Sequence, residues 1–188
     1  MFSIISRLFS NRKIKWFHGQ YGAIVSGVNG NNHRTIAAFY EYMSKWSKSQ
    51  IRKSGVQVLT YAHWEDVGAA VICNEVVTEP ILLINVGFLQ CMYLQNGMSA
   101  ARAAMDILVS HELCHLEQIR SGKLKMFTNG SVIWEGVEYQ AVPIQHTKKY
   151  IEQPWEKEAT EAGIRRSVEL GIAPSVEEGW RAVMVGAR

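Results

Sequence analysis

Five residues near the middle of the chain constrain this sequence more than any other feature. Residues 111–115 read HELCH, in which two histidines stand four positions apart and a glutamate follows the first. On an α-helix such positions lie about 40° apart around the axis and about one turn apart along it. Two imidazoles placed in this way can hold one zinc ion, and the adjacent glutamate can reach a water bound to that ion.

The apolar pattern around the motif supports this interpretation. Advancing about 100° per residue from His111 defines one apolar stripe, which contains Met105, Leu108, Leu116 and Ile119. Glu112 falls in the middle of that stripe, where an unpaired charge on a purely structural helix is costly. Pairing with a buried basic residue would account for it, but a metal ion with its water and a cleft accounts for it better. We therefore predict that His111 and His115 bind a metal ion.

A catalytic zinc site takes three protein ligands and keeps one position open. The metzincin arrangement needs Gly three residues and His six residues after the second histidine, where this chain has Gln118 and Ser121. Both aspartates, Asp66 and Asp106, precede the motif, which excludes a downstream aspartate ligand. The remaining candidates are His146 and several glutamates.

Among these candidates, the segment PWEKEA at residues 154–159 favours Glu156. On a helix Glu156 lies on a face of small residues, which allows another helix to approach closely. Glu158 lies on the charged face, next to an i,i+4 ion pair, so we expect it to be solvated or to contact a ligand. The helix dipole alone would also favour a glutamate in the first turn. We predict Glu156 as the third ligand, with His146 as the second choice.

The remaining patterns predict an α+β domain. We expect helices from Asn31 or Asn32 to about residue 54, over 99–121, over 154–170 and after Ser175, strands at 56–61, 69–73 and 81–88, and a hairpin over 126–142. We assign residues 1–30 to a basic docking arm and residues 31–188 to a single domain.

Composition and charge exclude several classes of protein. The three cysteines lack CxxC spacing, which argues against a disulfide scaffold or a zinc ribbon. No apolar run approaches the roughly 20 residues of a membrane helix, and no classical signal peptide is evident. Residues 1–55 hold nine Lys or Arg and one acid. This excess would suit an acidic partner or a solvated helix face, and we do not expect nucleic acid as a partner.

With these residues the chain resembles zincin metallopeptidases of the Glu-ligand (gluzincin) type. That family carries HExxH on a core helix and takes its third ligand from an ExxA pattern, which residues 156–159 match. The Asp that often follows ExxA in this family is Thr160 here. More narrowly, the order HELCH, WEG at 134–136, Tyr139, Tyr150 and PWEKEA resembles small metallopeptidase-like proteins of tailed phages. The resemblance covers about residues 81–162.

The resemblance implies a zincin-like fold, in which a small mixed sheet packs on the long HExxH helix among further helices. It also implies an edge strand, at residues 81–88 or its neighbour, that pairs with an extended peptide substrate. Zn²⁺ would be the cofactor, and Glu112 would pass a proton from the zinc-bound water to the leaving amine. Tyr139, Tyr150 and His146 would be the available oxyanion or substrate contacts.

The alternative is a catalytically silent, zincin-like structural or interaction protein, for example a component of a phage particle. In that case the metal would stabilise the fold, and the basic arm would dock on a virion or another protein. Either interpretation places the protein in the host cytoplasm or in a virion. A closed site with four protein ligands would favour the structural role, and an open coordination position would favour the peptidase.

Overall fold

The computed structural model describes residues 17–18, 24–27, 37, 39–61, 68–142 and 147–186. The chain folds into two compact units, the first comprising residues 1–72 and 80–109 and the second residues 73–79 and 110–188. Helices and strands both contribute, which confirms the α+β class predicted from the sequence. The single domain over residues 31–188 and the docking arm at residues 1–30 stay predictions.

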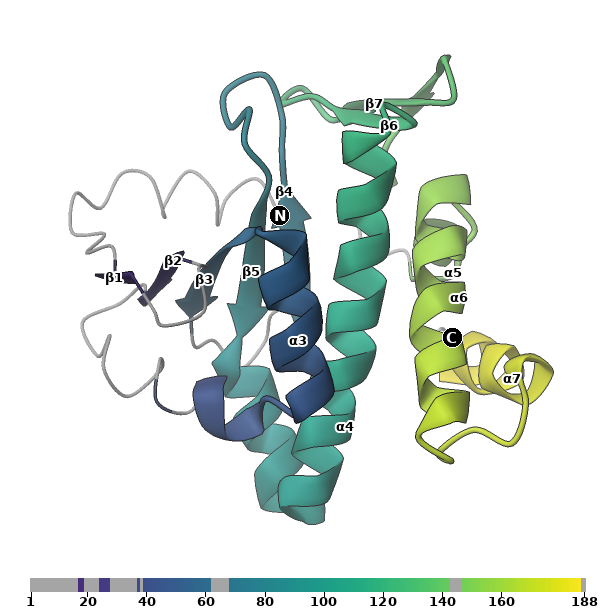
Figure 1. Cartoon of the computed structure of the whole chain (residues 1–188). Coiled ribbons are helices and arrows are strands. Elements are labelled where there is room, and N and C mark those ends of the chain that lie inside the picture. The colour runs from purple at the N-terminus through teal and green to yellow at the C-terminus, as the bar shows by residue number, and fades with distance from the viewer. Residues whose placement is uncertain are drawn as a thin grey trace. The chain divides into compact units, whose positions relative to one another are not determined.

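Five of the described strands form a mixed sheet in the first unit, in the order β1-β2-β3-β5-β4 (Figure 1). They are β1 (Phe17–His18), β2 (Ile24–Gly27), β3 (Gln57–Tyr61), β4 (Ala69–Ile72) and β5 (Ile81–Asn85). β3 runs parallel to β2 and β5, whereas β1 and β4 pair antiparallel with their neighbours. Every residue of β5 is buried, which accounts for the apolar run over residues 81–84 of this interior strand.

The structure corrects the strand predicted at residues 81–88. β5 ends at Asn85, and helix α4 (Val86–Arg120) begins with the next residue. Asn85 Oδ1 accepts hydrogen bonds from the amides of Gly87 (3.0 Å) and Phe88 (3.3 Å), so this buried side chain caps the helix. Of the two candidates predicted for the edge strand, residues 81–88 or a neighbouring strand, the first is excluded, because β5 lies between β3 and β4. Among the described strands, its neighbour β4 ends the sheet.

Helix α3 (Lys45–Ser54) is shorter than the predicted helix that starts at Asn31 or Asn32. Residues 39–42 are helical, but the helix is interrupted at residues 43–44. Ser44 Oγ accepts from the amide of Ser47 (3.1 Å) and donates to Asp106 (2.6 Å), so Ser44 caps a new helix. The proposed caps at Asn31 and Asn32 lie outside the described residues.

Helix α4 consists of two helical segments that meet at Gly97. Gly97 has φ 81° and ψ 177°, a conformation that is essentially restricted to glycine. The segment after Gly97 corresponds to the helix predicted at residues 99–121. Its buried Ala101, Met105 and Val109 belong to the first unit, and the HELCH motif belongs to the second.

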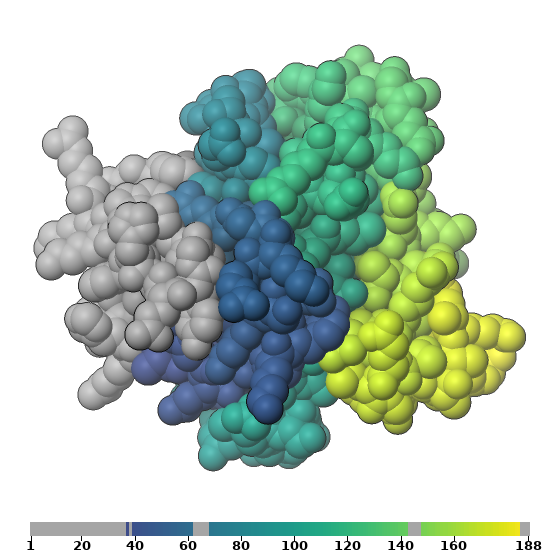
Figure 2. All heavy atoms as spheres, in the orientation of Figure 1, coloured from purple at the N-terminus to yellow at the C-terminus, as the bar shows by residue number. Residues whose placement is uncertain are grey.

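The sheet of the second unit contains the hairpin predicted over residues 126–142, and among the described residues it has three strands where a hairpin has two. Three described strands, β6 (Leu124–Met126), β7 (Ser131–Trp134) and β8 (Val137–Gln140), pair antiparallel in sequence order. Glu135 and Gly136 both have positive φ (50° and 83°), as a two-residue type I′ turn requires. Figure 2 shows residues 73–79 beside this sheet, where the Glu75 carboxylate accepts from the amide of Thr128 (3.0 Å).

Three helices follow, α5 (Thr147–Ile151), α6 (Pro154–Glu169) and α7 (Val176–Gly186). The predicted helices over residues 154–170 and after Ser175 are confirmed. α6 lies alongside the motif-bearing part of α4 (Figure 1). Between them, Ser110 Oγ donates to the carbonyl of Ala162 (3.0 Å). None of the helices among the described residues has both the length and the hydropathy of a membrane span.

Candidate metal centre

The motif places its two histidines one above the other on α4. His115 is buried, whereas the side chain of His111 is 23% exposed. Their rings are 4.8 Å apart, and the two Nε2 atoms are separated by 3.2 Å. Both imidazoles therefore direct a ring nitrogen to one point, as the i,i+4 spacing predicted.

Glu156 reaches the same point from the first turn of α6. Its Oε2 lies 3.6 Å from His111 Nε2 and 3.5 Å from His115 Nε2. Oε2 is buried and makes no hydrogen bond within the described part of the chain. His111, His115 and Glu156 thus form a group that could hold a metal ion, with the three side chains that the sequence predicted.

The three distances fit a tetrahedral ion. Zinc bonds to imidazole nitrogen and carboxylate oxygen are about 2.0–2.2 Å long, so tetrahedral ligand atoms stand about 3.3–3.5 Å apart. The observed separations are 3.2, 3.5 and 3.6 Å. A point about 2.1 Å from all three atoms lies about 0.7 Å from their plane, as in a regular tetrahedron. The donor set, two nitrogens and one oxygen, also suits zinc.

Gln118, on the same helix as the two histidines, contacts the site and was not among the predicted site residues. Gln118 Oε1 lies 2.8 Å from Nδ1 of His115. Its amide nitrogen donates to the Trp155 carbonyl (3.1 Å) and to Glu158 Oε2 (3.0 Å). The sequence could have indicated Gln118 by its position, because a residue three positions after the second histidine lies on the same face of the helix.

Tyr150 on α5 contacts the other oxygen of the third ligand. Its hydroxyl donates to Glu156 Oε1 at 2.7 Å. This bond occupies Oε1 and leaves Oε2 directed at the two histidines. Burial, followed by the charge of Glu156, raises the pKa of Tyr150, so the hydroxyl keeps its proton and remains a donor.

Without a metal ion, the site favours a protonated imidazole beside a carboxylate. Burial alone would lower the pKa of His115, but the close carboxylate of Glu156, 3.5 Å from its Nε2, raises it to about 9. Burial alone would raise the pKa of Glu156, but the imidazoles of His111 and His115, 3.6 and 3.5 Å from its Oε2, lower it to about 2. The carboxylate is therefore ionised at neutral pH, as a metal ligand must be.

Glu112, the predicted general base, is buried at 4% exposure. Its charge contributes to raising the pKa of both His115 and Tyr150, so it lies within electrostatic reach of the three-residue group. The structure therefore places a second carboxylate near the ligands, where the helical pattern predicted it.

The other predicted candidates lie in different surroundings. Tyr139 is 38% exposed, and its ring packs edge-on against Trp155 at 5.6 Å. Trp155 itself belongs to a small core with Leu124, Val132 and Trp134. His146 lies outside the described residues.

Glu158 and Cys114 are near the site but do not belong to the ligand group. Glu158 is 44% exposed and pairs with Lys123 at 3.0 Å. Its carboxylate also accepts from Gln118, so it contacts the neighbour of His115 and not a ligand itself. Burial raises the pKa of Cys114 to about 11, so its thiol stays protonated at neutral pH.

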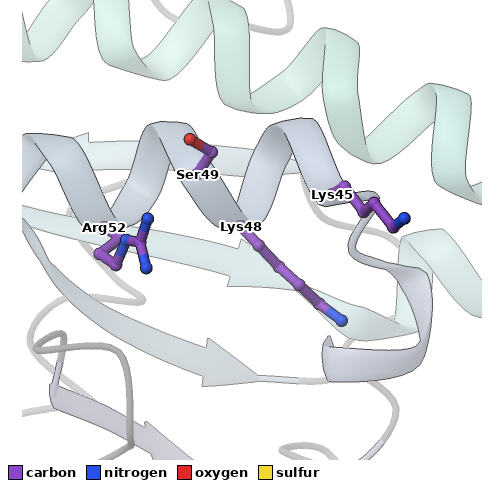
Figure 3. Close-up of a pocket in the computed structure, with 4 residues that line it drawn as sticks. All are labelled: Lys45, Lys48, Ser49 and Arg52. Carbon is purple, nitrogen blue, oxygen red and sulfur yellow. The ribbon is translucent and has the colours of Figure 1, made fainter.

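A separate surface pocket lies on α3 in the first unit (Figure 3). Lys45, Lys48, Ser49 and Arg52 line it. Its lining offers three cationic side chains and no usual metal ligand, so it is a different kind of surface from the His–His–Glu group. It carries part of the positive charge that the sequence concentrates in its first third.

Comparisons with protein families, curated proteins and solved structures found no match to this chain. The arrangement of its own residues therefore carries the functional argument.

Proposed function

We propose that the protein is a zinc-dependent metallopeptidase. The observation that carries this proposal is the convergence of three ligand atoms at tetrahedral spacing beside a buried glutamate. The exposed part of His111 supports a site that solvent and substrate can reach. Three ligands, with no fourth His, Cys, Asp or Glu grouped with them in the described residues, fit a site that keeps one position open.

Each residue has a distinct role in this proposal. His111 Nε2, His115 Nε2 and Glu156 Oε2 hold the zinc ion. Bound zinc supplies a Lewis acid, which polarises a peptide carbonyl and lowers the pKa of a water molecule to about 7. Glu112 takes a proton from the attacking water on its carboxylate and delivers it to the nitrogen of the leaving amine.

Tyr150 supports the third ligand in this scheme, because its hydroxyl proton is directed at Glu156 Oε1. Tyr139 and His146 remain predicted contacts to substrate or oxyanion. Docking of residues 1–30 on a virion or another protein, and the phage setting, also remain predictions.

Replacement of Glu112 by Gln tests the proposed reaction. The wild-type protein should bind one zinc ion and cleave members of a peptide library, and a chelator should abolish cleavage. Glu112→Gln should retain the zinc and lose about 10²- to 10⁴-fold in kcat, because the amide cannot accept the proton. Glu117→Gln, which changes an exposed charge on the same helix, should leave kcat within twofold.

Two outcomes would contradict the proposal. Cleavage by Glu112→Gln at the wild-type rate would exclude Glu112 as the base. A wild-type protein that binds zinc stoichiometrically but cleaves no member of the library would instead indicate the structural role.

A further inference from the structure

We propose that Gln118 is a positioning residue that fixes which nitrogen of His115 binds the metal and ties this ring to the turn carrying Glu156. The proposal rests on the zinc site of the proposed function, but not on peptide hydrolysis. Gln118 is 2% exposed and lies one turn after His115 on α4. Such a buried amide needs partners for both its oxygen and its nitrogen.

The partners of the amide nitrogen determine how the side chain is oriented. The Trp155 carbonyl and the Glu158 carboxylate lie 3.1 and 3.0 Å from it, and both groups only accept hydrogen bonds. The NH₂ group must therefore face them, which directs Oε1 at His115 Nδ1.

This orientation fixes the tautomer of the neutral imidazole. Because Gln118 Oε1 can only accept, the ring proton must be on Nδ1 of His115, and Nε2 keeps its lone pair. Nε2 is the atom that faces His111 Nε2 and Glu156 Oε2. A hydrogen bond to the far nitrogen also increases the basicity of a ligating imidazole.

The same side chain connects the second and third ligands. Its contact on α6 is the carbonyl of Trp155, the residue directly before Glu156. One amide group therefore bonds both to a ligand ring on α4 and to the backbone beside the ligand on α6. Losing it should loosen the spacing of the two ligands as well as the orientation of the ring.

Glu158 acts on the site through Gln118. Its carboxylate accepts from the Gln118 amide and from Lys123 Nζ, at 3.0 Å each. A carboxylate partner polarises the amide, which strengthens the bond from Gln118 to the imidazole. The PWEKEA segment thus contributes one carboxylate to the metal and another to the side chain that orients His115.

The wild-type protein provides the first test. In ¹⁵N NMR spectra of the zinc-loaded protein, His115 should show a slowly exchanging proton on Nδ1 and the shift of a metal-bound nitrogen on Nε2. A proton on Nε2, or zinc bound through Nδ1, would overturn the proposal. This measurement needs no variant and no substrate.

Zinc affinity, measured by competition with a chromophoric chelator, provides the second test. Gln118→Met keeps the size of the side chain but removes its acceptor, and should weaken zinc binding by about 10- to 100-fold. Glu158→Gln should weaken it less, and the exposed control Glu117→Gln should leave it within twofold. Zinc binding by Gln118→Met within twofold of wild type would contradict the positioning role.

An exchange of the two groups separates positioning from simple core packing. Gln118→Glu alone places two carboxylates together and should weaken zinc binding. Combining it with Glu158→Gln restores one acid and one amide, and with them an acceptor for the Nδ1 proton, but not the donor to the Trp155 carbonyl. Zinc affinity of the double variant should therefore recover part of the way, to a value above that of Gln118→Glu alone. No recovery, with both proteins folded by circular dichroism, would contradict the proposal. If Gln118→Met fails to fold, the NMR spectrum of the wild-type protein and the double variant Gln118→Glu with Glu158→Gln still test the proposal.

These measurements also distinguish the inference from the proposed function. A protein without peptidase activity that passes both zinc tests would lose the proposed function and keep the role of Gln118. An active peptidase in which substitution of Gln118 leaves zinc affinity unchanged would keep the proposed function and lose the role of Gln118.

Discussion

At the scale of residues, each buried ligand of the site is held from two sides. Glu156 faces the histidines with Oε2 and Tyr150 with Oε1, and His115 faces the site with Nε2 and Gln118 with Nδ1. Such outer contacts are a usual requirement for metal ligands, because they fix orientation before the ion binds. The ligand set was visible in the sequence, whereas this outer layer was not.

Removing the hydroxyl of Tyr150 distinguishes its two candidate roles. If Tyr150 orients Glu156, Tyr150→Phe should weaken zinc binding by roughly tenfold or more, since a hydrogen bond to a charged group contributes about 1.5–3 kcal/mol. If Tyr150 instead served the oxyanion, kcat would fall while zinc affinity stayed unchanged. Chelator competition and peptide kinetics on the same variant separate these outcomes, and Tyr93→Phe, at an exposed position in the first unit, is the control for loss of a hydroxyl.

At the scale of elements, α4 links the two units through the chain and is interrupted once. The kink at Gly97 sets where the continuous helix that carries the motif begins. The sequence predicted residues 86–88 as the end of a strand, because an apolar run before a helix resembles a buried strand. Asn85 decides the boundary, since its side chain caps α4 from within the sheet.

Replacing the glycine at the kink tests how much α4 depends on it. A Cβ at Gly97 would meet no atom within 4 Å, so Gly97→Ala adds backbone strain without a clash. Because φ 81° with ψ 177° is a glycine conformation, the free energy of unfolding should fall by about 1–3 kcal/mol. Chemical denaturation measures this. The control Ser99→Ala, at an exposed helical position nearby, should change the free energy of unfolding by less than about 0.5 kcal/mol. Equal effects of the two substitutions would contradict backbone strain at position 97.

At the scale of the whole molecule, all three ligands belong to the second unit, although α4 contributes to both. An ion that binds only the folded site stabilises the fold by mass action, by about 4 kcal/mol at a thousandfold excess over Kd. We expect EDTA to lower the unfolding temperature measured by calorimetry and added zinc to restore it. A chelator without effect on the zinc-loaded protein would contradict a metal-stabilised fold.

The metal-free protein should also lose stability as the pH rises. Burial acts to lower the pKa of His115, but the close carboxylate of Glu156 outweighs it, so folding raises this pKa from 6.5 to about 9. This contribution is complete below pH 6.5 and is lost as the pH rises through 9. The free energy of unfolding of the metal-free protein should therefore fall by on the order of 1–3 kcal/mol over this window, and His115→Gln should abolish the decline. A flat profile in urea denaturation would contradict the assignment.

The sequence by itself determined the helical face with His111, Glu112 and His115 and the choice of Glu156, because helix geometry fixes which side chains share a face. It also determined α6, α7 and the first hairpin, where proline, serine and glycine mark the ends. Only the tertiary structure decided the contacts of Gln118 and Tyr150, the position of β5 between β3 and β4, and the start of α3 at Lys45. These depend on partners such as Asp106 and Trp155, which are distant in the chain, and local patterns carry no information about such pairings.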